Sequence, residues 1–250
     1  MSEKRVFVFV GAYGSGKTEV AINYALHLNK EGKQVVMVDL DLVTPYFRSR
    51  EAACSLREKG IEVLAPPREL SRADLPILPP GITSVLKNKG KYVILDVGGD
   101  PTGARVLGTL QGLLPVRDLE VFYVVNARRP FTREVDQARD VLERIEASSR
   151  VKATALVNNT HLGDLTNPEV VLEGGDMVRE LAMRLGLPVK ITAVKKDLAS
   201  LIPNGHGVGM ILPLTRHMCT PWDEVPPDPG ADLAPVPLRV KAPSLEPTRD

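Results

Sequence analysis

The stretch from Arg5 to Thr18 constrains the fold of this chain more than any other part of the sequence. An apolar run, rich in β-branched and aromatic residues, passes directly into a loop with the spacing GxxxxGKT from Gly11 to Thr18. This is the Walker A pattern, in which glycines let consecutive backbone N–H groups surround a polyphosphate at the start of a helix. Apolar alternation from Val20 to Leu28 predicts that helix. We therefore expect a strand, a phosphate-binding loop and a helix.

The residue types in this loop assign its roles. Lys17 is expected to reach the β- and γ-phosphates and to act in catalysis, while the Thr18 hydroxyl is expected to bind Mg²⁺. Tyr13 lies inside the loop, and we expect its side chain to point away from the phosphates, where packing on the base and packing on a partner both stay open. The predicted nucleotide-binding residues of the loop are Gly11, Ala12, Tyr13, Gly14, Ser15, Gly16, Lys17 and Thr18. A glycine-rich turn that matches by chance is the alternative, and the predicted strand and helix argue against it.

Carboxylates follow two further predicted strands. The run from Gln34 to Asp39 reads as a buried strand that ends in Asp39-Leu40-Asp41, whose two carboxylates point the same way on extended backbone. The run from Lys91 to Asp96 reads as another strand, and two glycines follow it, as in a Walker B arrangement. Ligands bind at the carboxyl ends of strands in doubly wound sheets. The predicted metal-binding residues are Thr18, Asp39 and Asp96. A turn-capping role is the alternative for the carboxylates.

The glycines after Asp96 have a predicted role of their own. Gly98 and Gly99 would let the backbone respond to a γ-phosphate and change position.

Strand and helix patterns alternate through the rest of the chain. Further strands are predicted at Ile61 to Leu64, Leu119 to Val125, Val151 to Val157 and, as the last strand, Pro188 to Thr192. Further helices are predicted at Arg48 to Lys59, Thr102 to Leu114, Thr132 to Ala147 and within Pro168 to Leu185. This alternation predicts an α/β fold of the P-loop type, a mostly parallel twisted sheet with helices on both faces.

Proline content marks two segments outside this pattern. Residues 65–81 contain too many prolines for regular structure and predict an exposed irregular connection, either a lid or a partner surface. From Pro221 onward the sequence is proline-rich with little apolar periodicity. We therefore predict a P-loop nucleotide-binding domain at 1–220 and a proline-rich C-terminal tail at 221–250.

Composition excludes several classes of function. A net charge of +1 offers no global field for nucleic acid or an acidic membrane, so there is no strong nucleic-acid signal. Cys54 and Cys219 are far apart and form no CxxC pair, which argues against a cysteine-ligated metal within one chain but leaves a site shared between chains open. We expect no signal peptide at the N-terminus, and no apolar run reaches the roughly 18 residues of a membrane span. We expect a cytoplasmic protein.

The Walker A loop, Asp39-Leu40-Asp41 and the Asp96 segment together resemble the CobQ/MinD/ParA group of P-loop NTPases, in the SIMIBI class. The likeness covers about residues 4–205 and extends to ArsA-like ATPases and dethiobiotin synthetase relatives. It implies that Asp41 helps position the attacking water. It also implies that Asn158, at the end of Leu156-Val-Asn-Asn159, reads the base, commonly adenine.

One position departs from that resemblance. MinD and ParA proteins have a lysine directly after the first loop glycine, where this chain has Ala12. In the family that lysine reaches the partner's nucleotide in an ATP-bound dimer, so MinD-like activation is not implied here, although a homodimer stays open. The segment from Asp39 to Glu51 matches no named subfamily signature and indicates a poorly characterised branch.

Other charged residues carry weaker signals. Four arginines could contact phosphate or a substrate, or could lie at solvated helix ends: Arg48, Arg50, Arg128 and Arg129. His27 is expected to be structural. His206 lies in a glycine-rich loop that is expected to be a plain connection, with closure over the base or binding of a second substrate as the alternatives.

The leading hypothesis is a Mg²⁺-dependent ATPase, with ATP and Mg²⁺ as cofactors, that acts as a conformational switch or chaperone-like factor on an unknown protein partner. One alternative is a small-molecule kinase or ligase of the dethiobiotin synthetase type, with its acceptor near Arg48 or the proline-rich loop. Another is a GTP-dependent metal-insertion factor, against which no NKxD guanine motif is visible. A further alternative is a binding module that retains nucleotide without hydrolysing it.

Overall fold

A computed structural model describes residues 4–41, 52–66, 78–99, 101–203 and 209–218, which belong to one compact unit. Within them, the strands form an eight-stranded sheet in the order β3-β2-β4-β1-β5-β6-β7-β8, and all neighbouring strands are parallel. The strands are β1 (Val6–Val10), β2 (Val35–Leu40), β3 (Glu62–Leu64), β4 (Tyr92–Val97), β5 (Leu119–Val125), β6 (Ala155–Asn158), β7 (Val189–Lys195) and β8 (Met210–Leu214). The predicted α/β fold is confirmed.

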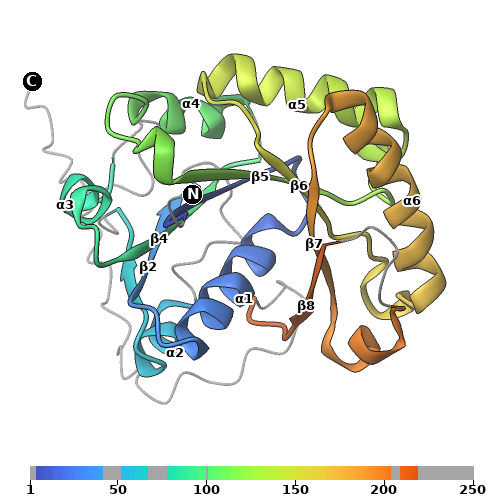
Figure 1. The fold of residues 1–250 in the computed structure, drawn as a ribbon, viewed down its shortest axis with the longest axis horizontal. Helices are drawn as coiled ribbons and strands as arrows, with labels where there is room; N and C mark the ends of the chain where they lie inside the picture. The colour runs from blue at the N-terminus through green and yellow to red at the C-terminus, as the bar shows by residue number, and fades with distance from the viewer. Residues whose placement is uncertain (1–3, 42–51, 67–77, 100, 204–208, 219–250) are drawn as a thin grey trace, which may run out of the picture. The chain divides into compact units, whose positions relative to one another are not determined.

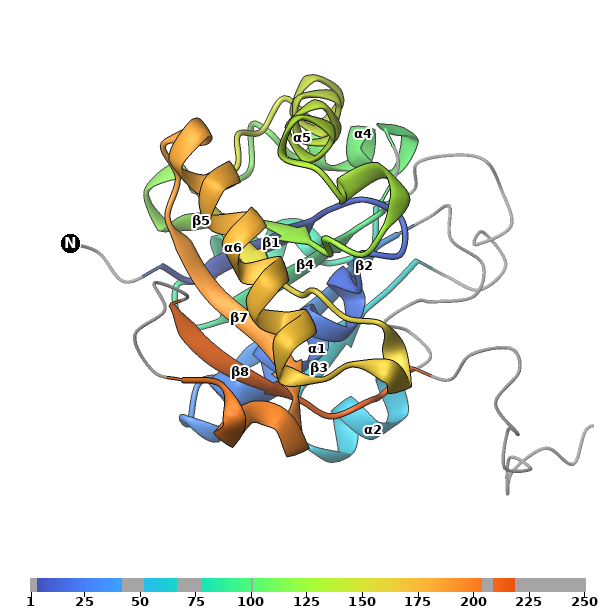
Figure 2. The same cartoon turned by 90° about the vertical axis from the view of Figure 1, so that its right-hand side faces the viewer.

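Helices cover both faces of the sheet. The helices are α1 (Lys17–Lys30), α2 (Ala53–Glu58), α3 (Ile82–Lys87), α4 (Pro101–Thr109), α5 (Val135–Ser149) and α6 (Pro168–Leu185). Short 3-10 helices are η2 (Val116–Asp118), η3 (Pro130–Thr132), η4 (Gly163–Leu165) and η5 (Lys196–Leu201). In Figure 1, α4 and α5 lie on one side of the strands, and α1 and α2 lie on the other, as Figure 2 also shows.

The central strand β1 shows why both faces are covered. Its side chains alternate, so Val6, Val8 and Val10 enter the core beneath α3 to α6, while Phe7 and Phe9 enter the core beneath α1 and α2. All five are nearly inaccessible to solvent. A strand that is apolar on both faces is typical of a parallel sheet buried between two helical layers.

Two elements were not predicted from the sequence. Strand β8 pairs with β7, so the segment from Pro188 to Thr192 is not the last strand as predicted. Pro213 lies inside β8 and cannot donate a ladder hydrogen bond, which an edge strand tolerates. Helix α3 has only 6 residues, too short for a readable helical period.

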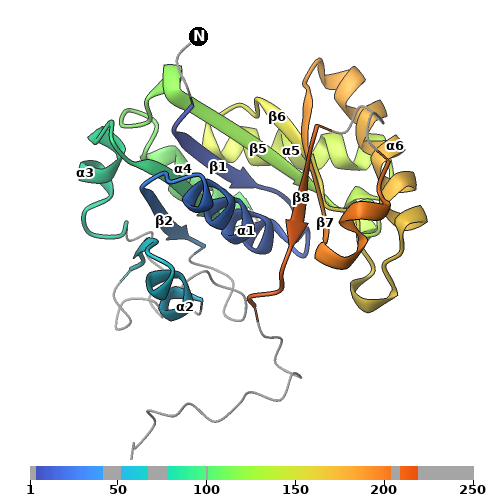
Figure 3. The same cartoon turned by 60° about the horizontal axis from the view of Figure 1, so that its bottom comes forward.

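The chain after β8 packs against the first helix. Asn23 Nδ2 donates to Thr215 O and Thr215 N donates to Asn23 Oδ1, both at 2.9 Å. Glu19 accepts hydrogen bonds from the backbone nitrogens of His217 at 2.6 Å and Met218 at 3.2 Å. Figure 3 shows β8 beside α1. The residues that follow the phosphate-binding loop therefore hold the end of the described chain.

Several predictions fall outside the described residues: the tail at 221–250, most of the connection at 65–81, Arg48, Arg50, Cys219 and His206. The division into a domain at 1–220 and a tail stays a prediction. None of the helices in the described part of the chain has the length and apolar character needed to cross a membrane.

Candidate nucleotide-binding site

The loop between β1 and α1 has the backbone of a phosphate cradle. Gly14 and Gly16 have φ angles of 74° and 79°, in the left-handed region that favours glycine. Gly16 caps α1, and Val20 N donates to Gly16 O at 3.0 Å, so the helix begins directly behind the loop. Tyr13 is 64% exposed. We call residues 11–18 the cradle.

Three buried carboxylates meet the cradle on the side of β2 and β4. Asp39 and Asp96 are register partners on these strands, and Asp41 directly follows β2. All three are 0% exposed. Lys17 Nζ lies 3.7 Å from Asp41 Oδ2, and Asp41 N donates to Asp39 Oδ1 at 3.0 Å. The structure thus brings together the residues that the sequence predicts for catalysis and metal binding.

Asp96 is the least satisfied of these groups. Neither of its carboxylate oxygens has a hydrogen-bond partner of ordinary geometry, although the Thr18 hydroxyl is close enough to favour the charged form. Burial raises the pKa of Asp96 to about 8, Lys17 opposes the shift, and Asp41 and Asp39 add to it. A buried, unpartnered carboxyl group facing a phosphate cradle fits a divalent cation as its missing partner.

The described residues contain no group of three or more His, Cys, Asp or Glu side chains that could hold a metal by themselves. A cation here would depend on ligands from outside the protein. Mg²⁺ typically keeps several waters and shares substrate phosphates. The donor set therefore suits a metal that arrives with a nucleotide.

The glycines after β4 pack directly on this site. A Cβ at Gly99 would lie 2.9 Å from Tyr13 N and 3.1 Å from Gly11 O, both backbone atoms of the cradle. A Cβ at Gly98 would lie 3.2 Å from Asp41 Oδ1. Only glycine fits at these two positions. A movement of the cradle or of Asp41 would therefore displace the segment after β4.

Two side chains hold the cradle from the opposite side, after β5 and β6. Asn159 Nδ2 donates to Ser15 O at 2.7 Å, and Arg129 Nε donates to Gly14 O at 2.9 Å. Sequence reasoning did not single out Asn159. Its signal was a polar residue at the carboxyl end of a buried strand, where ligands of parallel sheets bind.

Asn158 lies in a different place from the one implied by the resemblance. Its Nδ2 donates to Val171 O at 3.1 Å, and its Oδ1 accepts from Thr160 N at 3.1 Å and Thr160 Oγ1 at 2.7 Å. The residue is 0% exposed. Its amide joins β6 to α6 and has no edge to offer a base, so this geometry does not support a base-reading role.

The loops after β5 and β6 are joined by Asn126. Its Oδ1 accepts from Arg128 N at 3.0 Å and His161 N at 3.3 Å, and its Nδ2 donates to His161 O at 3.3 Å. Asn126 is 0% exposed. The Arg128 side chain forms an ion pair with Glu173 on α6 rather than with the cradle. These contacts fix the two loops relative to each other.

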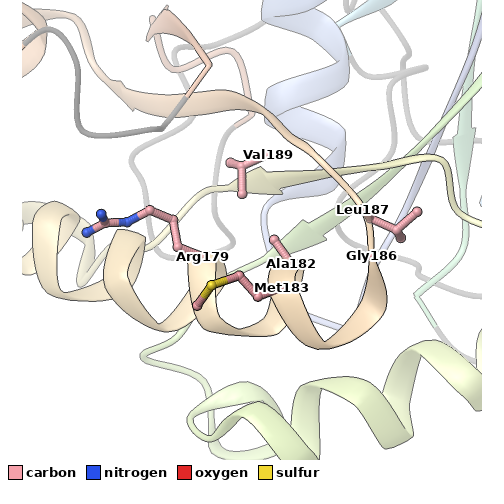
Figure 4. Close-up of a pocket in the computed structure, with 6 residues that line it drawn as sticks. All are labelled: Arg179, Ala182, Met183, Gly186, Leu187 and Val189. Atoms are coloured by element: carbon pink, nitrogen blue, oxygen red, sulfur yellow. The ribbon is translucent and has the colours of Figure 1, made fainter.

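A shallow depression of about 480 Å³ lies elsewhere, between the end of α6 and the start of β7. Figure 4 shows its lining residues: Arg179, Ala182, Met183, Gly186, Leu187 and Val189. Because β7 begins there, the depression lies at the amino end of that strand, whereas the cradle follows the carboxyl end of β1. It plays no part in the candidate site.

No protein-family model and no curated protein matches the chain. Solved structures do resemble it. FtsY, the signal recognition particle receptor of Elizabethkingia anophelis in complex with GDP, aligns with a TM-score of 0.52 and 17% identity over 87% of this chain and 62% of that one. Chloroplast FtsY from Physcomitrella patens aligns with a TM-score of 0.54 and 17% identity, covering 87% and 63%. FtsY from Thermotoga maritima aligns with a TM-score of 0.51 and 15% identity, covering 83% and 64%.

The chain therefore spans less than two thirds of the length of these FtsY structures. At such low identity the likeness is one of fold. The chain has the α/β fold of the P-loop nucleotide-binding proteins, with a parallel sheet and the cradle after its central strand.

Proposed function

We propose that this chain binds a Mg²⁺-nucleoside triphosphate in the cradle and hydrolyses it, and that the chain acts as a conformational switch. The observation that carries the proposal is the meeting of Lys17, Asp41 and Asp96 beside the cradle, with both Asp96 oxygens buried and unpartnered. Without ligand, the buried Asp96 carboxyl group lacks a hydrogen-bond partner of ordinary geometry, which is energetically unfavourable. A bound phosphate chain with its metal would relieve it.

The chemistry of this site would consist of positioning and charge stabilisation. The cradle N–H groups and Lys17 hold the phosphates, and Asp41 orients a water molecule for attack on the terminal phosphorus. Thr18 and Asp96 would hold Mg²⁺, with Asp39 behind them. The metal, when bound, neutralises charge on the phosphate oxygens. The described site has no nucleophile that calls for a covalent intermediate.

The contacts of Gly98 and Gly99 support the switch part of the proposal. These glycines touch Asp41 and the cradle backbone, and α4 begins two residues later. Loss of the terminal phosphate would change the cradle and Asp41, and the segment into α4 would respond. We propose that the partner that responds to this change is either another protein or a second copy of the chain.

The choice of base has two candidates. ATP follows from the resemblance in sequence, but Asn158, the residue expected to read adenine, is buried and bonded to Val171 and Thr160. GTP is the second candidate, because the Elizabethkingia FtsY structure of the same fold is in complex with GDP. Both nucleotides belong in the first experiment.

That experiment measures equilibrium binding of ATP and GTP with Mg²⁺, together with phosphate release. The variant is Lys17→Ala, and the matched control is Lys30→Ala, an exposed lysine at the other end of the same helix. We expect binding to weaken by roughly 10- to 100-fold in Lys17→Ala, since the lysine bonds a charged group, and to be unchanged in Lys30→Ala. If the native chain binds neither nucleotide, the proposed function is wrong.

A further inference from the structure

The loop after β5 carries an arginine that the proposed reaction does not use. Arg129 Nε bonds Gly14 O at 2.9 Å, and a Cβ at Gly14 would lie 3.2 Å from Nε and 3.3 Å from Cζ. The guanidinium group therefore packs directly against the cradle at Gly14. Arg129 as a whole is exposed to solvent.

The backbone of Arg129 is anchored. Arg129 N donates to Asn126 O, and Thr132 N donates to Arg129 O, both at 3.1 Å. The Thr132 hydroxyl donates to Asn126 O at 2.7 Å, and Thr132 is 0% exposed. These bonds fix the backbone position from which the Arg129 side chain reaches the cradle.

The sheet order places Arg129 opposite the metal-binding residues. Strands β4 and β5 lie on the two sides of β1, so Asp96 and Asp41 approach the cradle from one side and Arg129 from the other. A nucleotide whose terminal phosphates face Lys17, Asp41 and Asp96 must extend its nucleoside toward the other side. A nucleotide bound in this way would place its nucleoside, rather than its reacting phosphate, on the side of Arg129.

His161, after β6, completes this side. Its Nε2 lies 3.5 Å from the position of a Cβ on Gly16, and its Nδ1 accepts a hydrogen bond from Gly163 N at 3.3 Å. Burial lowers the pKa of His161 to about 4, with Arg129 and Lys195 adding to the shift. The histidine is neutral at pH 7, so Arg129 supplies the positive charge on this side of the cradle next to Gly14.

We propose that Arg129 is a nucleoside-binding residue whose guanidinium plane packs on the ribose and base while its Nε holds the cradle. A planar cation can lie on the face of a purine, and a lysine cannot reproduce that contact. The inference rests on the proposed function, since it needs a nucleotide in the cradle.

The experiment compares Arg129→Ala with Arg128→Ala, the neighbouring arginine that pairs with Glu173 instead. The probes are the triphosphate that the native chain binds best, its diphosphate, and inorganic tripolyphosphate, all with Mg²⁺. Tripolyphosphate carries the phosphate charge but no nucleoside. We expect Arg129→Ala to weaken tripolyphosphate by no more than about threefold, through the lost Nε–Gly14 O hydrogen bond, and to weaken both nucleotides equally by about tenfold beyond that loss. Arg129→Lys should recover less than half of the binding free energy that the nucleotides lose, and Arg128→Ala should leave the affinity for every probe unchanged.

Three outcomes overturn the inference. Equal loss for tripolyphosphate would show that Arg129 acts on the phosphates or on cradle geometry, and no loss for any probe would make it a surface residue. A native chain that binds tripolyphosphate and nucleotide alike, with no nucleoside contribution, also overturns it. A native chain that binds no probe refutes the proposed function itself, which separates the two failures.

Discussion

The side-chain amide of Asn159 donates a hydrogen bond to the backbone carbonyl of Ser15, 144 residues earlier, at 2.7 Å. The neighbouring Asn158 points into the protein instead, toward Val171 and Thr160. Two adjacent and chemically identical side chains therefore have separate roles. One supports the cradle, and the other supports the packing of β6 against α6.

Alanine substitutions separate these roles. Asn159→Ala should weaken nucleotide binding by roughly three- to tenfold, since one hydrogen bond to the cradle is lost, and should also lower the free energy of unfolding because that bond is buried. Asn158→Ala leaves buried partners unsatisfied and should lower the free energy of unfolding by about 1–3 kcal/mol. Calorimetric binding and thermal unfolding of both variants check this. A large binding defect with native stability in Asn158→Ala would restore the base-reading role.

Proton release should accompany metal-nucleotide binding. Burial holds the pKa of Asp96 at about 8, so in the ligand-free protein at pH 7 this carboxyl group is largely protonated. A cation favours the ionised form, and the proton leaves on binding. Affinity should therefore rise between about pH 6 and pH 8 and level off above it. Titration calorimetry in buffers of different ionisation enthalpy counts the protons, and Asp96→Asn should release fewer. An unchanged count in that variant would contradict the assignment.

The free energy of unfolding should fall as pH rises, because of the partly buried Glu19 carboxyl group. Burial raises its pKa to about 7 from 4.5, against the opposing effect of the His217 and Met218 backbone N–H groups and of Arg216. Above pH 4.5 the unfolded chain ionises this group while the folded chain still holds the proton, so unfolding is favoured progressively up to about pH 7. The contribution is up to about 3 kcal/mol. Chemical denaturation at several pH values should show this fall in the free energy of unfolding for the native chain and not for Glu19→Gln. Glu31→Gln, an exposed glutamate just after the same helix, is the control.

Gly99→Ala should disable the cradle. The added methyl group would lie 2.9 Å from Tyr13 N and 3.1 Å from Ala12 C, both backbone atoms that cannot rotate away. We expect a loss of stability of about 1–3 kcal/mol and nucleotide binding too weak to measure. Gly112→Ala is the control, because a Cβ there meets nothing within 4 Å. Binding that survives in Gly99→Ala would show that the segment after β4 moves aside without cost.

The parts of the site that could be predicted from the sequence are those whose chemistry is local. The spacing from Gly11 to Thr18 defines the cradle within eight consecutive residues, and carboxylates at the ends of β2 and β4 gather at one edge because parallel strands share it. The strands were read correctly where apolar runs are continuous. Strand β8 was missed because Pro213 interrupts its pattern.

Long-range partners could not be predicted. The register of β6 and the packing of α6 decide whether Asn158 or Asn159 faces the cradle. Neither can be read from two adjacent asparagines in the sequence. The partner of Arg129 lies 115 residues away, and the backbone groups held by Glu19 lie beyond residue 216. These contacts are products of the assembled sheet.

The contacts of α1 with residues 215–218 have a consequence for biosynthesis. The helix behind the cradle leaves the ribosome early, but Asn23 meets Thr215 across 192 residues and Glu19 meets Met218 across 199. Until that late segment emerges, a growing chain has the phosphate-binding loop without the backbone groups that cover its first helical turn. The contacts of this helix are therefore complete only once residue 218 has been made, and a nascent chain stalled before residue 215 leaves Asn23 and Glu19 without these partners.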